Sequence, residues 1–133
     1  MPGKNAAILG LTTLLLFGGQ ATATDLIDLT EAESGRTVRV SVGQGVVVTL
    51  TSNPSTGYSW SFRCAPAEAL ETVGEPEYLP DQPVRPGSGG RMRYRFTATL
   101  KGEAALRFEY RRSWETDVPP ARAATYTLVV GAR

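Results

Sequence analysis

The sequence predicts an all-β protein, specifically an immunoglobulin-like antiparallel β-sandwich of about seven strands. Apolar and polar residues alternate with a period of two along most of the chain, as expected for strands with one buried face. β-branched and aromatic residues fill these segments, and Gly, Pro, Asn and Ser separate them. Short strands with turn residues between them, in a domain of about 110 residues, are typical of a sandwich.

Three strands are predicted in the first half of this domain. Residues 37–42 (TVRVSV) alternate valines with polar residues, and residues 46–51 (VVVTLT) form a second β-branched run. Residues 58–63 (YSWSFR) place three aromatic side chains on one face and polar residues on the other. Trp60 belongs to that aromatic face, so we expect it to pack in the core.

The second half is predicted to contain a short helical turn, an edge strand and three regular strands. The turn is expected at residues 65–70. The Pro-containing segment 71–79 suits an edge strand, because Pro cannot donate a ladder hydrogen bond. The regular strands are predicted at residues 91–100, 104–111 and 124–131.

The N-terminus has the pattern of a secretory signal peptide at residues 1–23, followed by the folded domain at residues 24–133. Lys4 precedes the apolar stretch 6–17, which is too short to span a bilayer comfortably, and Ala21-Thr22-Ala23 is an A-x-A cleavage site. The alternative is an uncleaved N-terminal anchor. Cleavage predicts an exported domain, either periplasmic or secreted.

The amino-acid counts exclude several classes of protein. The 133 residues contain no His and one Cys, which leaves no Ser-His-Asp or Cys-His catalysis, no His-ligated or Cys-rich zinc site and no iron–sulfur cluster. We therefore expect neither an enzyme nor a protein with a metal or other cofactor. Loss of residues 1–23 would remove Lys4 and leave 13 acidic residues balanced by as many basic ones. Without a basic field, neither nucleic acid nor a membrane is an expected partner of the mature domain. We expect the domain to be a monomer.

Three features that could suggest chemistry have simpler explanations. The alternating arginines of the strand at 91–100 are typical of a solvated face. Glu68 and Glu71 could form a carboxylate pair, but nothing in the sequence indicates the cleft that acid–base catalysis needs. Cys64 is expected to be a free thiol that packs as a small apolar residue at the end of a strand.

Three loops carry the remaining distinctive residues. The first loop is Ser52-Asn53-Pro54-Ser55-Thr56-Gly57-Tyr58, the second loop is Arg85-Pro86-Gly87-Ser88-Gly89-Gly90, and the third loop is Arg111-Arg112-Ser113-Trp114-Glu115 with the Val118-Pro119-Pro120 that follows. Each loop taken alone can be explained as a turn. If consecutive strands are antiparallel, every second connection lies at the same end of the sandwich, so we expect the three loops to lie together. A Pro-stiffened loop, a Gly-rich strip and a Trp flanked by Arg indicate a recognition surface at that end.

These loops resemble those of the chagasin-like inhibitors of papain-family cysteine proteases, inhibitor family I42. That family carries N-P-T-T-G, then G-x-G-G, then R-P-W or R-P-F. This sequence has Asn53-Pro-Ser-Thr-Gly57 followed by Tyr58, then Gly87-Ser-Gly-Gly90, then Arg112-Ser-Trp114. The likeness covers nearly the whole mature domain. Ser55 replaces a Thr and keeps the hydroxyl, whereas Ser113 replaces a Pro and so removes a constraint from the third loop.

The resemblance implies a reversible, non-covalent, competitive protein inhibitor that occludes the active-site cleft of a papain-like cysteine protease. It places Thr56 nearest the catalytic Cys of the protease, the second loop on the non-primed side of the cleft, and Trp114 on the primed side with Arg112 supporting its loop. The competing hypothesis is a secreted immunoglobulin-like adhesion or ligand-binding module without inhibitory activity. The predicted protease-binding residues are Asn53, Pro54, Ser55, Thr56, Gly57, Tyr58, Gly87, Ser88, Gly89, Gly90, Arg112, Ser113 and Trp114.

Overall fold

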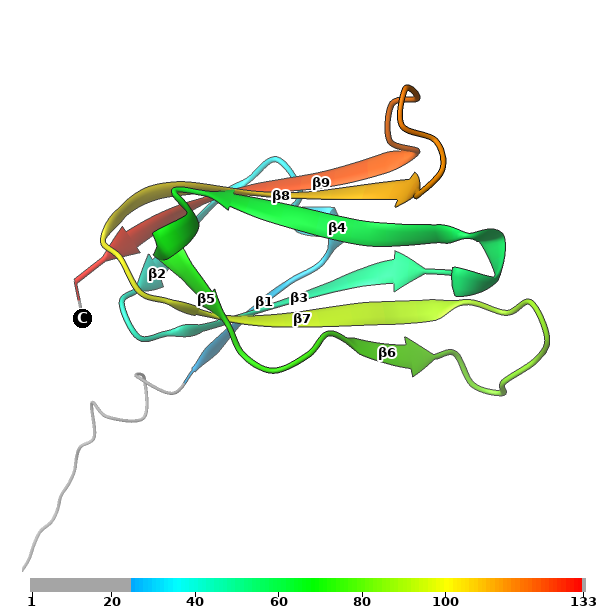
Figure 1. Ribbon diagram of the computed structural model, residues 1–133. Coiled ribbons are helices and arrows are strands. Elements are labelled where there is room, and N and C mark those ends of the chain that lie inside the picture. Colours follow the sequence, from blue (N-terminus) through cyan, green and yellow to red (C-terminus); the bar gives the residue numbers. More distant parts are fainter. Residues whose placement is uncertain (1–24, 133) are drawn as a thin grey trace, which may run out of the picture.

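The computed structural model describes residues 25–132, which form two β-sheets packed face to face (Figure 1). The predicted signal peptide at residues 1–23 lies outside the described residues. One sheet contains five strands and the other four. The predicted all-β sandwich is therefore confirmed.

The first sheet has the strand order β1-β3-β7-β5, and β6 also pairs with β7. Its strands are β1 (Leu26–Leu29), β3 (Gly45–Ser52), β5 (Leu70–Thr72), β6 (Glu77–Pro80) and β7 (Gly90–Ala98). The second sheet has the order β2-β9-β8-β4. Its strands are β2 (Thr37–Ser41), β4 (Tyr58–Ala65), β8 (Gly102–Arg112) and β9 (Arg122–Gly131). Three short 3₁₀ turns complete the described chain: η2 (Glu31–Glu33), η3 (Pro54–Thr56) and η4 (Ala67–Ala69).

The described residues form nine strands rather than about seven. β1 has only four residues, too few for an alternating pattern to stand out. The predicted edge strand at 71–79 is divided into β5 and β6, with Gly74 between them at a φ of 71°. Five strand pairings are antiparallel as predicted, whereas β1–β3 and β2–β9 are parallel. The predicted turn at 65–70 is present as η4.

The core between the sheets is centred on the fully buried ring of Phe108 in β8. Trp60 is 8% exposed and packs in this core, as predicted, whereas Phe62 on the same strand is 37% exposed because β4 is an edge strand of its sheet. Rings from both sheets surround Phe108, with centroids 5.1 to 6.5 Å from its own; they belong to Trp60, Phe62, Tyr94, Phe96 and Tyr126. These side chains therefore set how the sheets are stacked.

An ion pair on the flank of the sandwich also joins the two sheets. Glu31 in η2 accepts hydrogen bonds from the backbone N–H and the hydroxyl of Thr51 in β3, at 3.0 and 2.7 Å. The same carboxylate pairs with the guanidinium of Arg122 at the start of β9. Partial burial raises the pKa of Glu31, but the hydrogen bonds from Arg122 and Thr51 outweigh it and hold the pKa below its ordinary value of 4.5.

Because the folded-state pKa of Glu31 lies below the unfolded value, its contribution to stability is present above about pH 4.5 and disappears as the pH falls through the folded-state pKa. We expect Glu31→Gln to lower the free energy of unfolding at pH 7 by about 1 kcal/mol, since the ion pair is partly solvated. The difference from the wild type should shrink as the pH is lowered from 7 to 3, because protonation of Glu31 removes the charge that binds Arg122 and Thr51. Urea denaturation at both pH values measures this. An equal difference at pH 7 and pH 3 would show that Glu31 acts through its shape alone.

Candidate functional site

The three loops lie together at one end of the sandwich (Figure 1). Strand direction explains this position. β5 and β6 both run antiparallel to β7, so together they cross the sandwich once, as a single strand would. The additional strand β1 comes before all three loops in the chain, so it does not change which of them share an end. The first loop connects β3 to β4, the second follows β6 and the third connects β8 to β9.

The first loop is a 3₁₀ turn held by its own polar groups. Asn53 accepts hydrogen bonds at its side-chain oxygen from the backbone N–H and the hydroxyl of Ser55, at 3.2 and 2.6 Å. The Thr56 hydroxyl donates to the Asn53 carbonyl at 2.7 Å. Pro54 begins the turn, and Gly57 ends it in the left-handed region with a φ of 83°. The tip, residues 54–57, is exposed and has a defined shape before any partner binds.

The second loop is also closed by local bonds. The Ser88 hydroxyl donates to the Arg85 carbonyl at 2.7 Å and accepts from the Arg85 N–H at 3.2 Å. Gly87 offers its carbonyl to the Asn53 side-chain amide at 3.1 Å, which ties the second loop to the first. A Cβ on Gly89 would lie 3.0 Å from the Ser52 carbonyl oxygen, so the two backbones meet where only glycine fits well.

Gly90 differs from its neighbours in the predicted binding set. It is buried as the first residue of β7, opposite Ser52 on one side and Pro80 on the other. A Cβ at this position would overlap the Leu79 carbonyl. Gly90 therefore serves the sheet, and the part of the Gly-rich strip that faces outward is Gly87 to Gly89.

The third loop places Trp114 against the first loop. The indole is 66% exposed, and its edge lies over Gly57, where a Cβ would be 2.6 Å from Trp114 Cη2. The guanidinium of Arg112 lies 4.5 Å from the Tyr58 ring centroid and 5.7 Å from that of Trp114. Arg112 Nε also donates to the Thr56 carbonyl at 3.1 Å. Side chains of the third loop thus pack directly on the first.

The structure brings the predicted binding residues together at one end of the sandwich, and Gly90 is the one among them that is buried. It also adds two residues that the sequence patterns did not single out, Tyr110 in β8 and Arg122 in β9. The Tyr110 hydroxyl accepts the Asn53 backbone N–H at 2.9 Å, and Arg122 stacks on the Tyr110 ring with its guanidinium 4.8 Å from the centroid. Tyr110 lies within the predicted strand at 104–111 and Arg122 lies just before the predicted strand at 124–131, and nothing local in the sequence reveals a contact such as that of Tyr110 with Asn53, 57 positions away.

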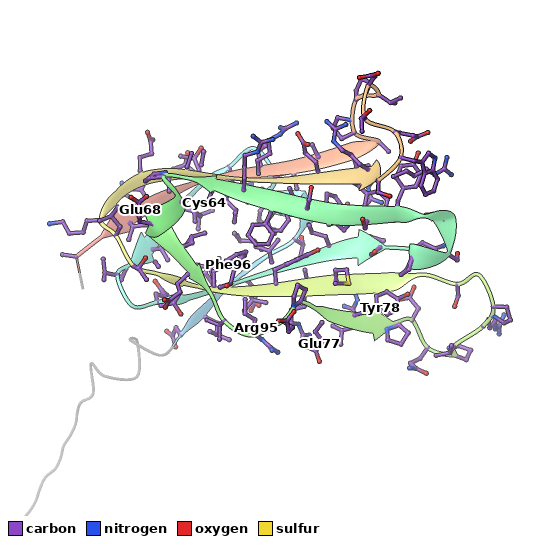
Figure 2. All side chains as sticks on the ribbon, viewed as in Figure 1. Cys64, Glu68, Glu77, Tyr78, Arg95 and Phe96 are labelled. Carbon is purple, nitrogen blue, oxygen red and sulfur yellow. The ribbon has the colours of Figure 1, made fainter. Side chains whose placement is uncertain are left out.

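The residues that the sequence analysis explained without a functional role lie away from the three loops; those placed by the structure here are Cys64, Glu68, Arg93 and Arg95. Figure 2 shows Cys64 and Glu68 near the opposite end of the sandwich, and burial raises the pKa of the Cys64 thiol, which disfavours the reactive thiolate. Arg93 and Arg95 each lie 3.4 Å from Glu77 on the outer face of the first sheet, as partly solvated ion pairs.

Two further findings concern residues 25–132 only. No helix in this range is long and apolar enough to cross a membrane. No group of three or more His, Cys, Asp or Glu side chains in this range could hold a metal ion.

Comparison with known proteins places this geometry in a family. The family model described as Chagasin family peptidase inhibitor I42 matches residues 39–130. Chagasin from Trypanosoma cruzi is 36% identical over 90 residues, which cover 65% of this chain and 81% of chagasin. Amoebiasin-1 from Entamoeba histolytica is 34% identical over 109 residues, which cover 80% of this chain and 100% of that protein.

Solved structures agree with the sequence comparison. The crystal structure of a cysteine protease inhibitor from Entamoeba histolytica superposes with a TM-score of 0.71 at 25% identity, covering 80% of this chain and 96% of that chain. The solution structure of Amebosin gives a TM-score of 0.63 at 33% identity, covering 80% of this chain and 99% of that chain. This chain therefore belongs to the chagasin family of peptidase inhibitors, family I42, and is a protease inhibitor of that family rather than an enzyme.

Proposed function

We propose that this protein is a reversible, non-covalent, competitive inhibitor of papain-like cysteine proteases, and that its three loops occlude the active-site cleft. The observation that carries the proposal is the interlocked loop end, in which three separate loops present one exposed surface of defined shape. Family membership and a relative described as a cysteine protease inhibitor support the target class. By the family likeness, the first loop sits over the catalytic Cys, the second on the non-primed side and Trp114 on the primed side.

The first loop is built to block a cleft without being cut. A protease cleaves an extended segment, whereas Pro54 and Gly57 hold this loop in a 3₁₀ turn. Extending it would break the hydrogen bonds of Asn53 with Ser55 and Thr56. Those losses, together with the contacts of Trp114 over Gly57, disfavour the extended conformation.

The third loop, in which Ser113 stands where the family has Pro, is held by contacts of Arg112. Arg112 is held between the Tyr58 and Trp114 rings and hydrogen-bonded to the first loop. A second contact, 3.8 Å long, joins Arg112 to Glu115. These contacts replace part of the rigidity that a proline ring would supply, so the proposed role of Trp114 stands without it.

Inhibition would be non-covalent because the loops carry no reactive group. Their polar side chains carry hydroxyls, an amide, guanidiniums, a carboxylate and an indole, and the free thiol of Cys64 is half-buried and far from them. The affinity must then come from shape and from a few anchors. Trp114 is the largest exposed side chain on this end and has the chemistry of an interface hot spot.

Titration of the protein into papain and several related proteases tests the proposal. We expect stoichiometric, competitive loss of activity. Trp114→Ala should weaken inhibition by about 2 kcal/mol or more, because a buried anchor is lost from the complex. It should leave the melting temperature unchanged, because the indole is 66% exposed in the free protein. Inhibition constants and thermal melts of the same preparations measure both effects.

Leu100→Ala is the control for this experiment, because Leu100 is an exposed apolar residue in the turn between β7 and β8, at the end opposite the loops. It should change neither quantity. Absence of inhibition across the panel at micromolar concentrations, or cleavage within residues 53–58, would falsify the inhibitor proposal and favour a non-inhibitory binding module. A lower melting temperature for Trp114→Ala would show that the indole supports the fold.

Gly57→Ala tests whether the contact between the first and third loops matters. An alanine at this position would have to keep a φ of 83°, and its methyl group would lie 2.6 Å from Trp114 Cη2, so the Trp114 indole or the first loop must shift. Gly74→Ala is the matched control, because its φ of 71° carries a similar strain but its Cβ would meet nothing within 4 Å. We expect each variant to lose about 1 kcal/mol of stability, and only Gly57→Ala to weaken inhibition, by about tenfold. Equal inhibition by both variants would show that the contact of Trp114 with Gly57 does not contribute to inhibition.

We also propose that the protein is exported, because a charged start, an apolar stretch and an A-x-A site precede the domain. When the full chain is expressed in a host with a secretory pathway, the recovered protein should begin at Thr24 and be found in the periplasm or the medium. Intact-mass measurement of the purified protein decides this. A chain that retains Met1 and fractionates with membranes would instead support the uncleaved anchor.

A further inference from the structure

A continuous stack of aromatic and guanidinium groups runs from the tip of the third loop to the start of β9. The Arg112 guanidinium lies 5.7 Å from the Trp114 centroid and 4.5 Å from the Tyr58 centroid. Tyr58 and Tyr110 are stacked with their centroids 5.1 Å apart. Arg122 follows, 4.8 Å from the Tyr110 centroid. The stack therefore links the first loop, the third loop and two strands of the second sheet.

The inner end of this stack also holds the backbone that leads into the first loop. The Tyr110 hydroxyl accepts the N–H of Asn53 at 2.9 Å. Two residues before Asn53, the carbonyl of Thr51 accepts hydrogen bonds from Trp60 Nε1 at 2.9 Å and from Arg122 at 3.3 Å. The base of the first loop is thus tied to side chains of the second sheet, although its own strand, β3, belongs to the first sheet.

Arg122 is itself fixed on the side facing away from the rings. Its guanidinium pairs with Glu31, whose carboxylate also binds Thr51. The guanidinium lies 5.3 Å from the Trp60 centroid as well. A cation held against two rings and one carboxylate has few alternative rotamers, so it forms a rigid end to the stack.

We propose that Tyr110 and Arg122, which lie outside the three loops, are positioning residues for inhibition. They hold the first loop at a fixed place relative to Trp114, and this inference rests on the proposed inhibitory function. A loop that also visits other positions is competent to bind for only part of the time, and the apparent inhibition constant rises by the inverse of that fraction. The hydroxyl of Tyr110 can be removed by substitution without disturbing the stacking of its ring on Tyr58 and Arg122.

Tyr110→Phe keeps the stack with Tyr58 and Arg122 but removes the acceptor of the Asn53 N–H. Tyr126→Phe is the matched control. Tyr126 is also a buried tyrosine with one hydroxyl hydrogen bond, 2.7 Å to the Thr30 carbonyl, and neither residue belongs to the three loops. Both substitutions delete one oxygen atom and one hydrogen bond from the same core, so both should lower the melting temperature similarly.

The first measurement uses the full chain without any protease. Amide hydrogen exchange followed by NMR should show Asn53 exchanging about tenfold faster in Tyr110→Phe, because its N–H has lost its acceptor. Tyr126→Phe should leave the exchange rate of Asn53 unchanged. Unchanged Asn53 exchange in Tyr110→Phe would overturn the inference, whatever the protein inhibits.

The second measurement is the inhibition constant against papain. We expect about a fivefold increase for Tyr110→Phe and none for Tyr126→Phe, despite similar melting temperatures. Equal inhibition constants for both variants would show that the tether affects the loop but not binding, and would overturn the positioning role. If the wild type does not inhibit papain or its relatives, the proposed function fails and the positioning role fails with it, while the exchange data still report whether Tyr110 holds the loop.

Discussion

The packing of two sheets through one aromatic core is the interaction on which the rest of this molecule depends. Phe108 contacts rings from both sheets, and the strands that carry those rings can stack in only one relative position without losing the contacts. That stacking decides which strand ends lie side by side. The first and second loops leave strands of one sheet and the third leaves a strand of the other, so the contacts of the third loop with the first exist only when the sheets are correctly stacked.

The loop end itself is stabilised at two levels. Each of the first two loops is closed by its own hydrogen bonds, which involve Asn53 and Ser88 and need no distant residue. Contacts between loops then fix their relative positions, through Gly87 and Arg112. A surface organised in this way has little conformational freedom left to lose on binding, which favours affinity from a small number of exposed groups. The proposed mode of inhibition fits the absence of His, because blocking a cleft depends on shape and requires no catalytic side chains.

Much of this architecture could be predicted from particular residues. Alternation in residues 91–100 and 104–111 correctly predicted β7 and β8, because one face of each strand is buried and the other is solvated. Trp60 was assigned to the core from its aromatic neighbours in the sequence. The nearness of the three loops followed from alternating strand directions, and it survived the division of residues 71–79 into β5 and β6 because both run the same way. Boundaries and short strands were less predictable, since β1 offers only four residues of pattern.

The fold class, the strands with regular alternation and the three loops with their turn-forming residues could be predicted before folding was considered, because they depend on local periodicity and backbone preference. The parallel pairings of β1 and β2, the burial of Gly90, and the stack that joins Trp114 to Arg122 become visible only in the folded molecule. These features depend on contacts between residues far apart in the chain, such as Asn53 with Tyr110 and Glu31 with Arg122. No local pattern encodes such contacts, because each partner is also an ordinary strand or turn residue until the sheets pack and bring the two together.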